Sequence, residues 1–144
     1  MLEKRTVLFV DDDKIMLQSI ERYLLDEPYH KLFAKGSKEA LDIMQQEKVH
    51  VIVSDIRMPV IDGNELLKIV RKKYPHVVKI VLSGYGGEAD LQTAVDQEGI
   101  FNLIPKPWNR KENLKIIILE AIDRFNLQNQ REMGQFITKG DSDV

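Results

Sequence analysis

Near its amino terminus the chain reads Thr6-Val7-Leu8-Phe9-Val10-Asp11-Asp12-Asp13. The apolar run over residues 6–10 lacks strict alternation of polar and apolar side chains, which is typical of a strand covered on both faces of a parallel sheet. Open parallel sheets bind ligands beyond the carboxyl ends of their strands, and an aspartate triplet follows this strand directly. The stretch therefore predicts a strand of a parallel sheet and the edge that carries its binding site.

Apolar periodicity over the rest of the chain predicts the other elements. Further apolar runs predict strands over His30–Ala34, Val49–Ser54, Val77–Leu82 and Phe101–Ile104. Between and after the strands, apolar stripes at helical spacing predict helices. These stripes are Met16, Ile20 and Leu24; Ser37, Ala40, Leu41 and Met44; Leu66, Leu67 and Val70; Leu91, Ala94 and Val95; and Leu114, Ile117, Ile118, Ala121, Ile122 and Phe125. Strand and helix alternate five times, and right-handed crossovers turn this order into an α/β, flavodoxin-like, doubly wound parallel sheet with helices on both faces.

The length of 144 residues fits one domain. Helical periodicity fades after Phe125, and residues 139–144 are polar and acidic. The sequence therefore predicts a domain over residues 1–126, followed over residues 127–144 by a fraying helix extension and a disordered polar tail.

Composition narrows the class of protein. The formal net charge is −2 with both signs interspersed, so no basic field is available to hold nucleic acid. The chain has no cysteine, which excludes disulfides and thiolate chemistry and suits a reducing compartment. No apolar run approaches the ~18 residues of a membrane span, and the first run is too short for a signal peptide. We expect a cytoplasmic protein that binds neither nucleic acid nor membranes.

Polar residues follow the other predicted strands at the same edge. Asp55 follows the third strand, Ser83 the fourth, and Lys106 the fifth. Carboxylates that share a crevice repel one another and gather a hard cation, for which all-oxygen ligands favour Mg²⁺. A carboxylate held against Mg²⁺ beside a lysine and a hydroxyl suits phosphoryl transfer. We therefore expect Asp55 to be the nucleophile, with Lys106 and Ser83 on the phosphoryl oxygens. Asp11 and Asp12 would hold the metal.

At these residues the sequence resembles the receiver domain of two-component response regulators, including the chemotaxis response regulator. The resemblance runs from about residue 5 to residue 125 and rests on Val7–Asp13, Ser54–Gly63, Leu82–Gly84 and Lys106–Trp108. It implies the strand order 2-1-3-4-5, Asp55 as phosphoacceptor with Ser83 and Lys106 beside it, and a Mg²⁺ site. The metal ligands that it implies are Asp11, Asp12, Asp55 and the backbone carbonyl of Arg57.

The resemblance also implies partners. A sensor histidine kinase or a phosphotransfer protein donates the phosphoryl group, and the receiver catalyses only its own phosphorylation and dephosphorylation, so it is not an enzyme in the ordinary sense. Phosphorylation switches the conformation and controls an output partner or a fused output domain. A homodimer through the fourth helix, fifth strand and fifth helix is common in the family. The Ser83–Tyr85 and Lys106–Trp108 pieces look similar to receivers fused to cyclic-di-GMP phosphodiesterases of the HD-GYP type.

One position departs from the family pattern. Leu103 stands where many receivers carry an aromatic side chain that moves with the hydroxyl residue. The glycines within Ser83–Gly87 give that loop additional backbone freedom, and we expect ordering of the loop to replace the aromatic switch.

Two rival functions stay open. Asp11 and Asp13 would be the nucleophile and acid of a haloacid-dehalogenase-like phosphatase, but Ile15 stands where that motif has threonine. The second rival is a degenerate receiver that acts as an interaction module without phosphorylation.

Two further groups of residues are assigned to the surface. His30, His50 and His76 lack metal-ligand spacing and are expected to be exposed. The basic cluster of Lys68 and residues 71–73 is expected to be a solvated face near a helix end.

Overall fold

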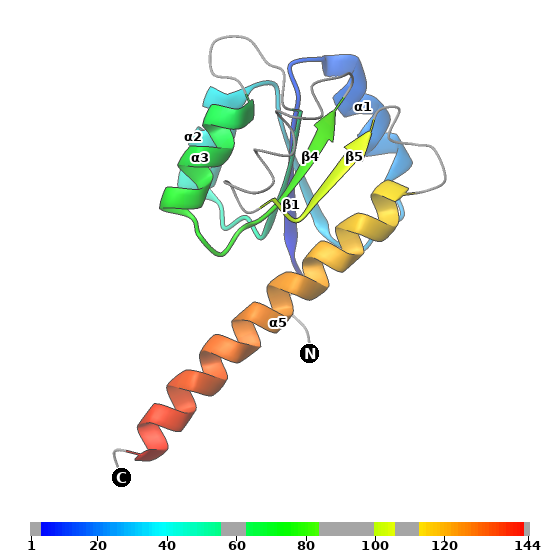
Figure 1. The fold of residues 1–144 in the computed structure, drawn as a ribbon. Coiled ribbons are helices and arrows are strands. Elements are labelled where there is room, and N and C mark those ends of the chain that lie inside the picture. The colour runs from blue at the N-terminus through cyan, green and yellow to red at the C-terminus, as the bar shows by residue number, and fades with distance from the viewer. Residues whose placement is uncertain (1–3, 56–62, 84–99, 106–112, 143–144) are drawn as a thin grey trace.

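The computed structural model describes residues 4–55, 63–83, 100–105 and 113–142 (Figure 1). The helix expected around Leu91, Ala94 and Val95 lies outside these residues. So do Arg57, Tyr85, Lys106 and Trp108.

Five parallel strands form one sheet in the order β2-β1-β3-β4-β5, as predicted for a flavodoxin-like fold. The strands are β1 (Thr6–Val10), β2 (His30–Ala34), β3 (Val51–Asp55), β4 (Val78–Ser83) and β5 (Asn102–Pro105). β1 and β2 coincide with their predicted ranges, whereas each of the other three begins and ends slightly later. The reason is the ladder, because Asp55 pairs with Leu82 and Ser83 pairs with Pro105. A search for apolar runs ends each strand before Asp55, Ser83 or Pro105, but hydrogen bonding to the neighbouring strand continues through these residues.

Helices cover both faces of the sheet. They are α1 (Lys14–Tyr23), α2 (Ser37–Gln46), α3 (Gly63–Lys73) and α5 (Asn113–Ser142). α1 and α5 lie on one face, and α2 and α3 lie on the other (Figure 1). This is the doubly wound arrangement that right-handed crossovers impose on a parallel sheet.

The core consists of two clusters, one on each face. In β1, Val7 and Phe9 belong to the cluster with α1 and α5, whereas Leu8 and Val10 belong to the cluster with α2 and α3. Phe9 also stacks on Phe33 of β2, with 5.3 Å between the ring centroids. Both faces of β1 are therefore buried, which explains why its sequence shows no polar alternation.

Asp13 begins α1. Its Oδ1 accepts hydrogen bonds from the backbone N–H groups of Ile15 at 2.9 Å and Met16 at 3.3 Å. The side chain therefore satisfies two amides that have no partner within the helix. The third aspartate of the triplet has a structural role, which the sequence reasoning did not assign.

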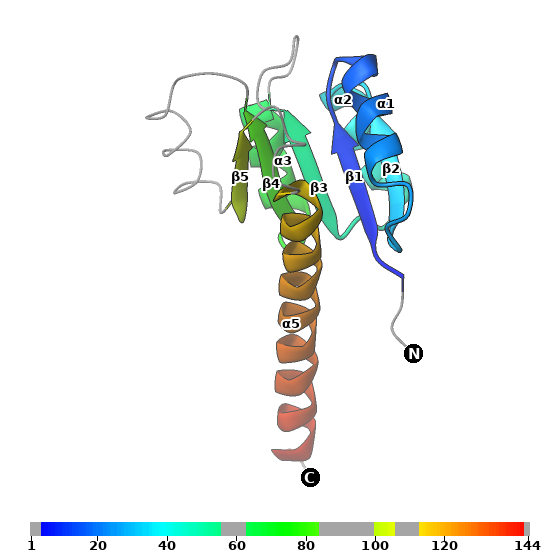
Figure 2. The ribbon, with the colours of Figure 1, turned by 90° about the vertical axis from the view of Figure 1, so that its right-hand side faces the viewer.

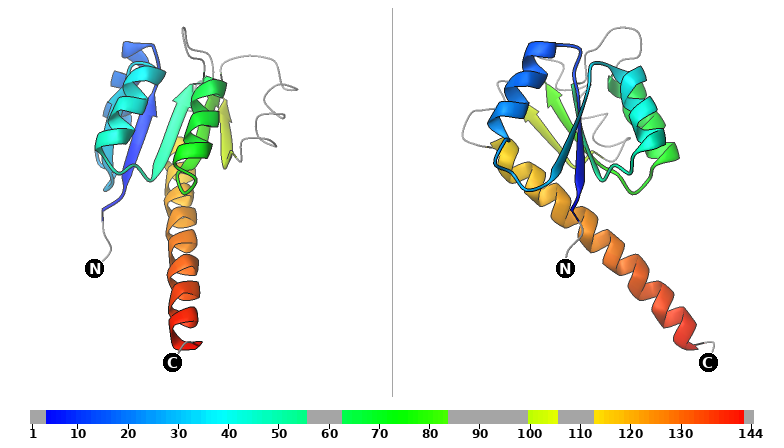
Figure 3. Two further views of the ribbon diagram at one scale, coloured as in Figure 1. Left: turned by 90° about the vertical axis from the view of Figure 1, so that its left-hand side faces the viewer. Right: turned by 180° about the vertical axis from the view of Figure 1, so that it is seen from behind.

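α5 continues well past Phe125. The sequence predicts a helix extension and a disordered tail over residues 127–144, and the helix runs to Ser142. Its carboxyl-terminal half extends beyond the edge at which the strands begin (Figures 2 and 3). Residues 127–139 include Gln, Arg, Glu, Met and Lys, which favour helix without needing a packed face. The domain boundary at residue 126 stays a prediction. Across the described residues, every helix is too short or too polar to span a bilayer.

A cluster of contacts holds α5 where it leaves the sheet. The Arg5 side chain donates a 2.8 Å hydrogen bond from Nε to Asn126 Oδ1, and its guanidinium lies 5.1 Å from the Phe125 ring centroid. The ring of His50 meets Phe125 edge-on at 4.8 Å, and its Nδ1 accepts a 2.9 Å hydrogen bond from the N–H of Thr6. Arg5, Thr6, His50, Phe125 and Asn126 together form what we call the α5 anchor.

The surface prediction holds for two of the histidines. His30 and His76 are exposed, but His50 is only 3% exposed. The prediction for His50 was wrong because its acceptor nitrogen and its ring both have partners distant in sequence. The basic cluster of Lys68 and residues 71–73 is exposed, as predicted.

Shortening a buried side chain of α3 should lower the stability of the domain. Leu67 is fully buried, so Leu67→Ala should lower the free energy of unfolding by about 2–5 kcal/mol through lost transfer energy and the cavity it leaves. Leu25→Ala removes the same atoms from a side chain that is 73% exposed and should change it by less than about 0.5 kcal/mol. Urea denaturation measures both, and equal losses would contradict the assignment of the core.

Two substitutions of Asp13 distinguish its capping role from the effect of its charge. Asp13→Ala should cost about 1 kcal/mol because the amides of the first turn of α1 lose their acceptor, whereas Asp13→Asn keeps an acceptor and should be near neutral. Urea denaturation of the two variants tests this difference. If Asp13→Asn were as unstable as Asp13→Ala, the charge rather than the cap would be responsible.

Candidate functional site

The carboxyl ends of the central strands bring the predicted site residues to one edge. Asp11 directly follows β1, and Asp55 is the last residue of the neighbouring strand β3. Val10 is level with Ser54 in the β1–β3 ladder, so Asp11 and Asp55 occupy corresponding positions at the edge. Adjacent parallel strands thereby join two segments that are far apart in sequence.

Carboxylates gather at this edge. One carboxylate oxygen each from Asp11, Asp12 and Asp55 lies within 4.8 Å of the others. Asp11 is 1% exposed and Asp55 is 7% exposed, while Asp12 is open to solvent. The three aspartates form what we call the acidic cluster, and they are the residues for which the sequence predicted metal binding.

The backbone fixes the two buried members of the cluster. The N–H of Asp11 donates to the carbonyl of Ala34 at the end of β2 at 3.1 Å, and its Oδ1 accepts from the N–H of Asp13 at 2.9 Å. The hydroxyl of Ser54 donates to the carbonyl of Asp55 at 2.9 Å. These bonds hold the chain on both sides of the site, so the carboxylates do not depend on a flexible loop for their position.

The electrostatics of the acidic cluster favour a cation. At an effective dielectric constant near 20, two carboxylate charges about 5 Å apart repel by about 3 kcal/mol. The oxygens of an octahedral Mg²⁺ shell are about 3–4 Å apart, and the 4.8 Å span of this cluster is close to that spacing. Oxygen-only ligands with high charge suit a hard divalent ion. The residues present therefore fit such a cation.

The structure brings together only some of the predicted site residues. Asp11, Asp12 and Asp55 meet, and the backbone of Ser83 ends β4 opposite Pro105, the last residue of β5. Arg57 and Lys106, predicted to supply a metal-ligating carbonyl and the phosphate-binding ammonium, lie outside the described residues. Their roles stay predictions, as does that of the Ser83 hydroxyl.

The sequence reasoning missed two supporting residues. Ser54 is fully buried and hydrogen-bonded to the Asp55 carbonyl, and a polar residue within an apolar strand was the available signal. Asp13 caps α1, and its place three residues before the first apolar residue of the α1 stripe was a recognisable N-cap signal. Because Asp13 Oδ1 accepts two backbone N–H groups, it serves the helix rather than the acid role that a dehalogenase-like phosphatase requires.

Comparison with known proteins identifies the family of the chain. The model of the response regulator receiver domain family matches residues 7–118. The hydrogenase transcriptional regulatory protein HoxA of Cupriavidus necator is 35% identical over 128 residues, which cover 89% of this chain and 26% of that protein. The DNA-binding transcriptional regulator NtrC of Proteus hauseri is 32% identical, over 99% of this chain and 30% of that protein. The chain thus spans less than a third of the length of these relatives.

Solved structures show the same architecture. A response regulator receiver domain protein from Clostridium thermocellum superposes with a TM-score of 0.77 at 31% identity, covering 86% of this chain and 98% of that one. The signal receiver domain of an HD domain-containing protein from Pseudomonas fluorescens gives a TM-score of 0.81 at 26% identity, covering 86% and 98%.

The family match spans the segment from β1 to the first turns of α5, which includes the acidic cluster and all five strands. The chain therefore belongs to the receiver domain family of two-component response regulators.

Proposed function

We propose that Asp55 accepts a phosphoryl group from a histidine kinase or phosphotransfer protein in a Mg²⁺-dependent reaction. The observation that carries this proposal is a buried aspartate at the end of β3 whose oxygen lies within 4.8 Å of oxygens of Asp11 and Asp12. A carboxylate is a competent nucleophile for phosphorus when the charge on both partners is neutralised.

The chemistry divides among the chain's own residues. An oxygen of Asp55 attacks phosphorus, the bond from phosphorus to the donor nitrogen breaks, and the donor histidine leaves with its electron pair. Asp11, Asp12, Asp55 and the backbone carbonyl of Arg57 would hold Mg²⁺, which offsets negative charge on the phosphoryl oxygens when bound. The Lys106 ammonium pairs with one of these oxygens, and the Ser83 hydroxyl donates to another. The positions at which β4 and β5 end support these two roles.

The only substrate that this site phosphorylates is the Asp55 side chain of the same protein. The acceptor is a side chain of the domain, so each phosphorylation consumes the nucleophile until the acyl phosphate is hydrolysed. The chain therefore catalyses only its own phosphorylation and dephosphorylation, and its product is a changed conformation. Loop ordering around Ser83 carries that change, with Leu103 in the position of the usual aromatic switch.

The relatives indicate which output domains this receiver controls, and exposed residues of α5 indicate how it dimerises. HoxA and NtrC are transcriptional regulators by name, and this chain spans 26–30% of their length, which favours a transcriptional output domain as the controlled partner. One solved structure is the receiver domain of an HD domain-containing protein, so an HD domain is the second candidate for the output domain. Ile116 and Leu119 are exposed apolar residues of α5, and they support a homodimer through the fourth helix, β5 and α5 in the cytoplasm.

Phosphorylation should be visible as a change of mass. Incubation with Mg²⁺ and acetyl phosphate should add one phosphoryl group of about 80 Da to the chain, and EDTA should prevent the gain. Intact-protein mass spectrometry reads the result. Asp55→Asn should show no gain, whereas Asp13→Asn, which keeps the cap of α1, should gain as the natural sequence does.

The outcomes separate the rivals. A gain that persists in Asp55→Asn would place the acceptor elsewhere. No gain with acetyl phosphate or with a histidine kinase would favour the interaction module. Sustained hydrolysis of a phosphomonoester that needs Asp13 would favour the phosphatase.

Metal affinity should depend on the acidic cluster and not on total charge. Asp12→Asn removes a ligand and should weaken Mg²⁺ binding by roughly tenfold or more. Asp13→Asn removes the same charge one residue away and should change the affinity by less than about threefold, since Asp13 is committed to the α1 cap. Amide chemical shifts of residues 11–13 during a Mg²⁺ titration measure both. Equal weakening would mean long-range electrostatics rather than ligation.

A further inference from the structure

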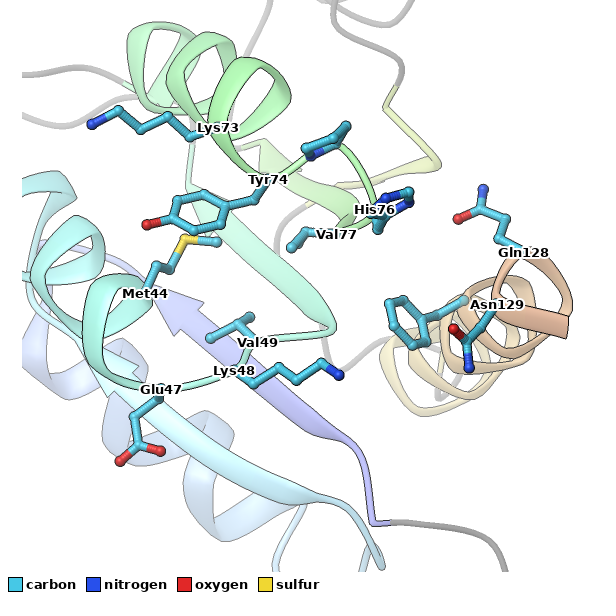
Figure 4. Close-up of a pocket in the computed structure, with 12 residues that line it drawn as sticks. Met44, Glu47, Lys48, Val49, Lys73, Tyr74, His76, Val77, Gln128 and Asn129 are labelled. Carbon is cyan, nitrogen blue, oxygen red and sulfur yellow. The ribbon is translucent and has the colours of Figure 1, made fainter. Parts of the chain in front are cut away.

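A cavity of about 340 Å³ opens at the other edge of the sheet, where the strands begin (Figure 4). It lies between the end of α2 with the loop to β3, the loop from α3 to β4, and one side of α5. The lining residue Val49 is six residues before Asp55, which corresponds to about 20 Å along an extended strand. The cavity is therefore separate from the acidic cluster and has no part in the proposed phosphorylation.

The inner walls of the cavity are apolar. Met44, Val49, Val77 and Phe125 line it, and each is buried in the folded chain. Tyr74 adds a half-buried ring. These walls suit the hydrocarbon part of a ligand.

Polar groups stand around these walls. The ammonium of Lys48 points toward α5, whereas the carboxylate of Glu47 and the ammonium of Lys73 point away from the space between Val49, Val77 and Phe125 (Figure 4). The amide side chains of Gln128 and Asn129 line the α5 side. Lys48 and Asn129 are exposed and Gln128 is half-buried, so these groups stand at the mouth of the cavity. The lysine carries positive charge there, and the amide groups across from it can donate hydrogen bonds.

The α5 wall is held in place before any ligand arrives. Phe125 is contacted by the Arg5 guanidinium and by the His50 ring, and the neighbouring Asn126 accepts a hydrogen bond from Arg5. The α5 anchor therefore fixes the helix that carries Gln128 and Asn129. Binding in a preformed site avoids the cost of ordering side chains and loops.

The size and surroundings of the cavity favour a small molecule over a protein surface. Its volume is at the lower end of the ~300–1,000 Å³ of ligand pockets. Among the residues whose side-chain exposure the structure describes, which end at residue 130, the exposed large apolar side chains are Ile15, Leu25, Ile116, Leu119 and Leu127, and none of them lines the cavity. The apolar surface here is inside the cavity and not around it, which is the reverse of a docking patch. The exposed residues 71–73 add positive potential nearby and would attract an anion.

We propose that this cavity binds a small organic carboxylate with an apolar body. The hydrocarbon part packs against Val49, Val77 and Phe125, and the carboxylate pairs with the Lys48 ammonium and accepts from the amides of α5. Such a ligand contacts α5 at the last turn that packs on the sheet. The site is thus a second input to the domain, at the edge opposite to the acidic cluster.

A matched pair of probes tests the proposal on the full chain. 2-Naphthylacetate should shift the backbone amides of Lys48, Val49, Val77 and residues 125–129 in a saturable way, with a dissociation constant of about 1 mM or lower. 2-Naphthylacetamide has nearly the same shape without the charge and should bind about tenfold more weakly. Two-dimensional ¹H–¹⁵N NMR follows both titrations.

Substitutions then test whether the Lys48 ammonium is the group that pairs with the carboxylate of the ligand. Lys48→Gln should weaken binding of the carboxylate about tenfold and leave binding of the amide unchanged. Lys72→Gln removes an exposed charge that does not line the cavity and should change neither by more than about twofold. Asp55→Asn should bind both probes normally, so failure of phosphorylation and failure of this site are distinguishable. Absence of saturable shifts, equal binding of the two probes, or shifts centred on residues 11–13 would each overturn the proposal.

Discussion

The parallel pairing of β1 with β3 is the constraint on which the rest of the structure depends. Their register runs from Val7 opposite Val51 to Val10 opposite Ser54. It places the residue after β1 beside the last residue of β3, and so it builds the acidic cluster. A slip of one residue would turn every side chain of β3 to the other face of the sheet. Val51 and Val53 would leave the α1–α5 side of the core, and Asp55 would no longer face Asp11.

Burial on both faces protects this register. Each strand of the centre contributes alternate side chains to two separate cores, so a slip would cost contacts on both sides at once. That packing allows the fold to keep Asp11 and Asp55 buried at its edge despite their repulsion. The same repulsion favours the proposed binding of a divalent cation, which would offset it. Stability of the core and chemistry of the edge are therefore linked through one set of strands.

The two edges of the sheet are equipped for different tasks. At the carboxyl ends of the strands, the Asp11 N–H donates to the Ala34 carbonyl and the Ser54 hydroxyl donates to the Asp55 carbonyl, and these bonds hold the negative charge of the proposed cation and phosphoryl site. At the amino ends, the α5 anchor holds the helix that projects from the domain, and a cavity with an exposed lysine at its mouth lies beside it. The central strands β1 and β3, of five residues each, connect the two edges. α5 packs along one face of the sheet between the two edges.

The sequence by itself determined the class of fold, the order along the chain of the elements that the structure describes, and the identity of the acidic residues. These follow from local properties, namely apolar runs, helical stripes and polar residues that directly follow strands. Strand ends were shifted where pairing rather than hydrophobicity decides, as at Asp55 and Ser83. The capping role of Asp13 was within reach of a local rule and was missed. Only the tertiary structure decided that His50 is buried, because its partners Thr6 and Phe125 are distant in the chain and no local pattern encodes their meeting. The same holds for the cavity beside α5, whose walls come from three segments that only the folded sheet brings together.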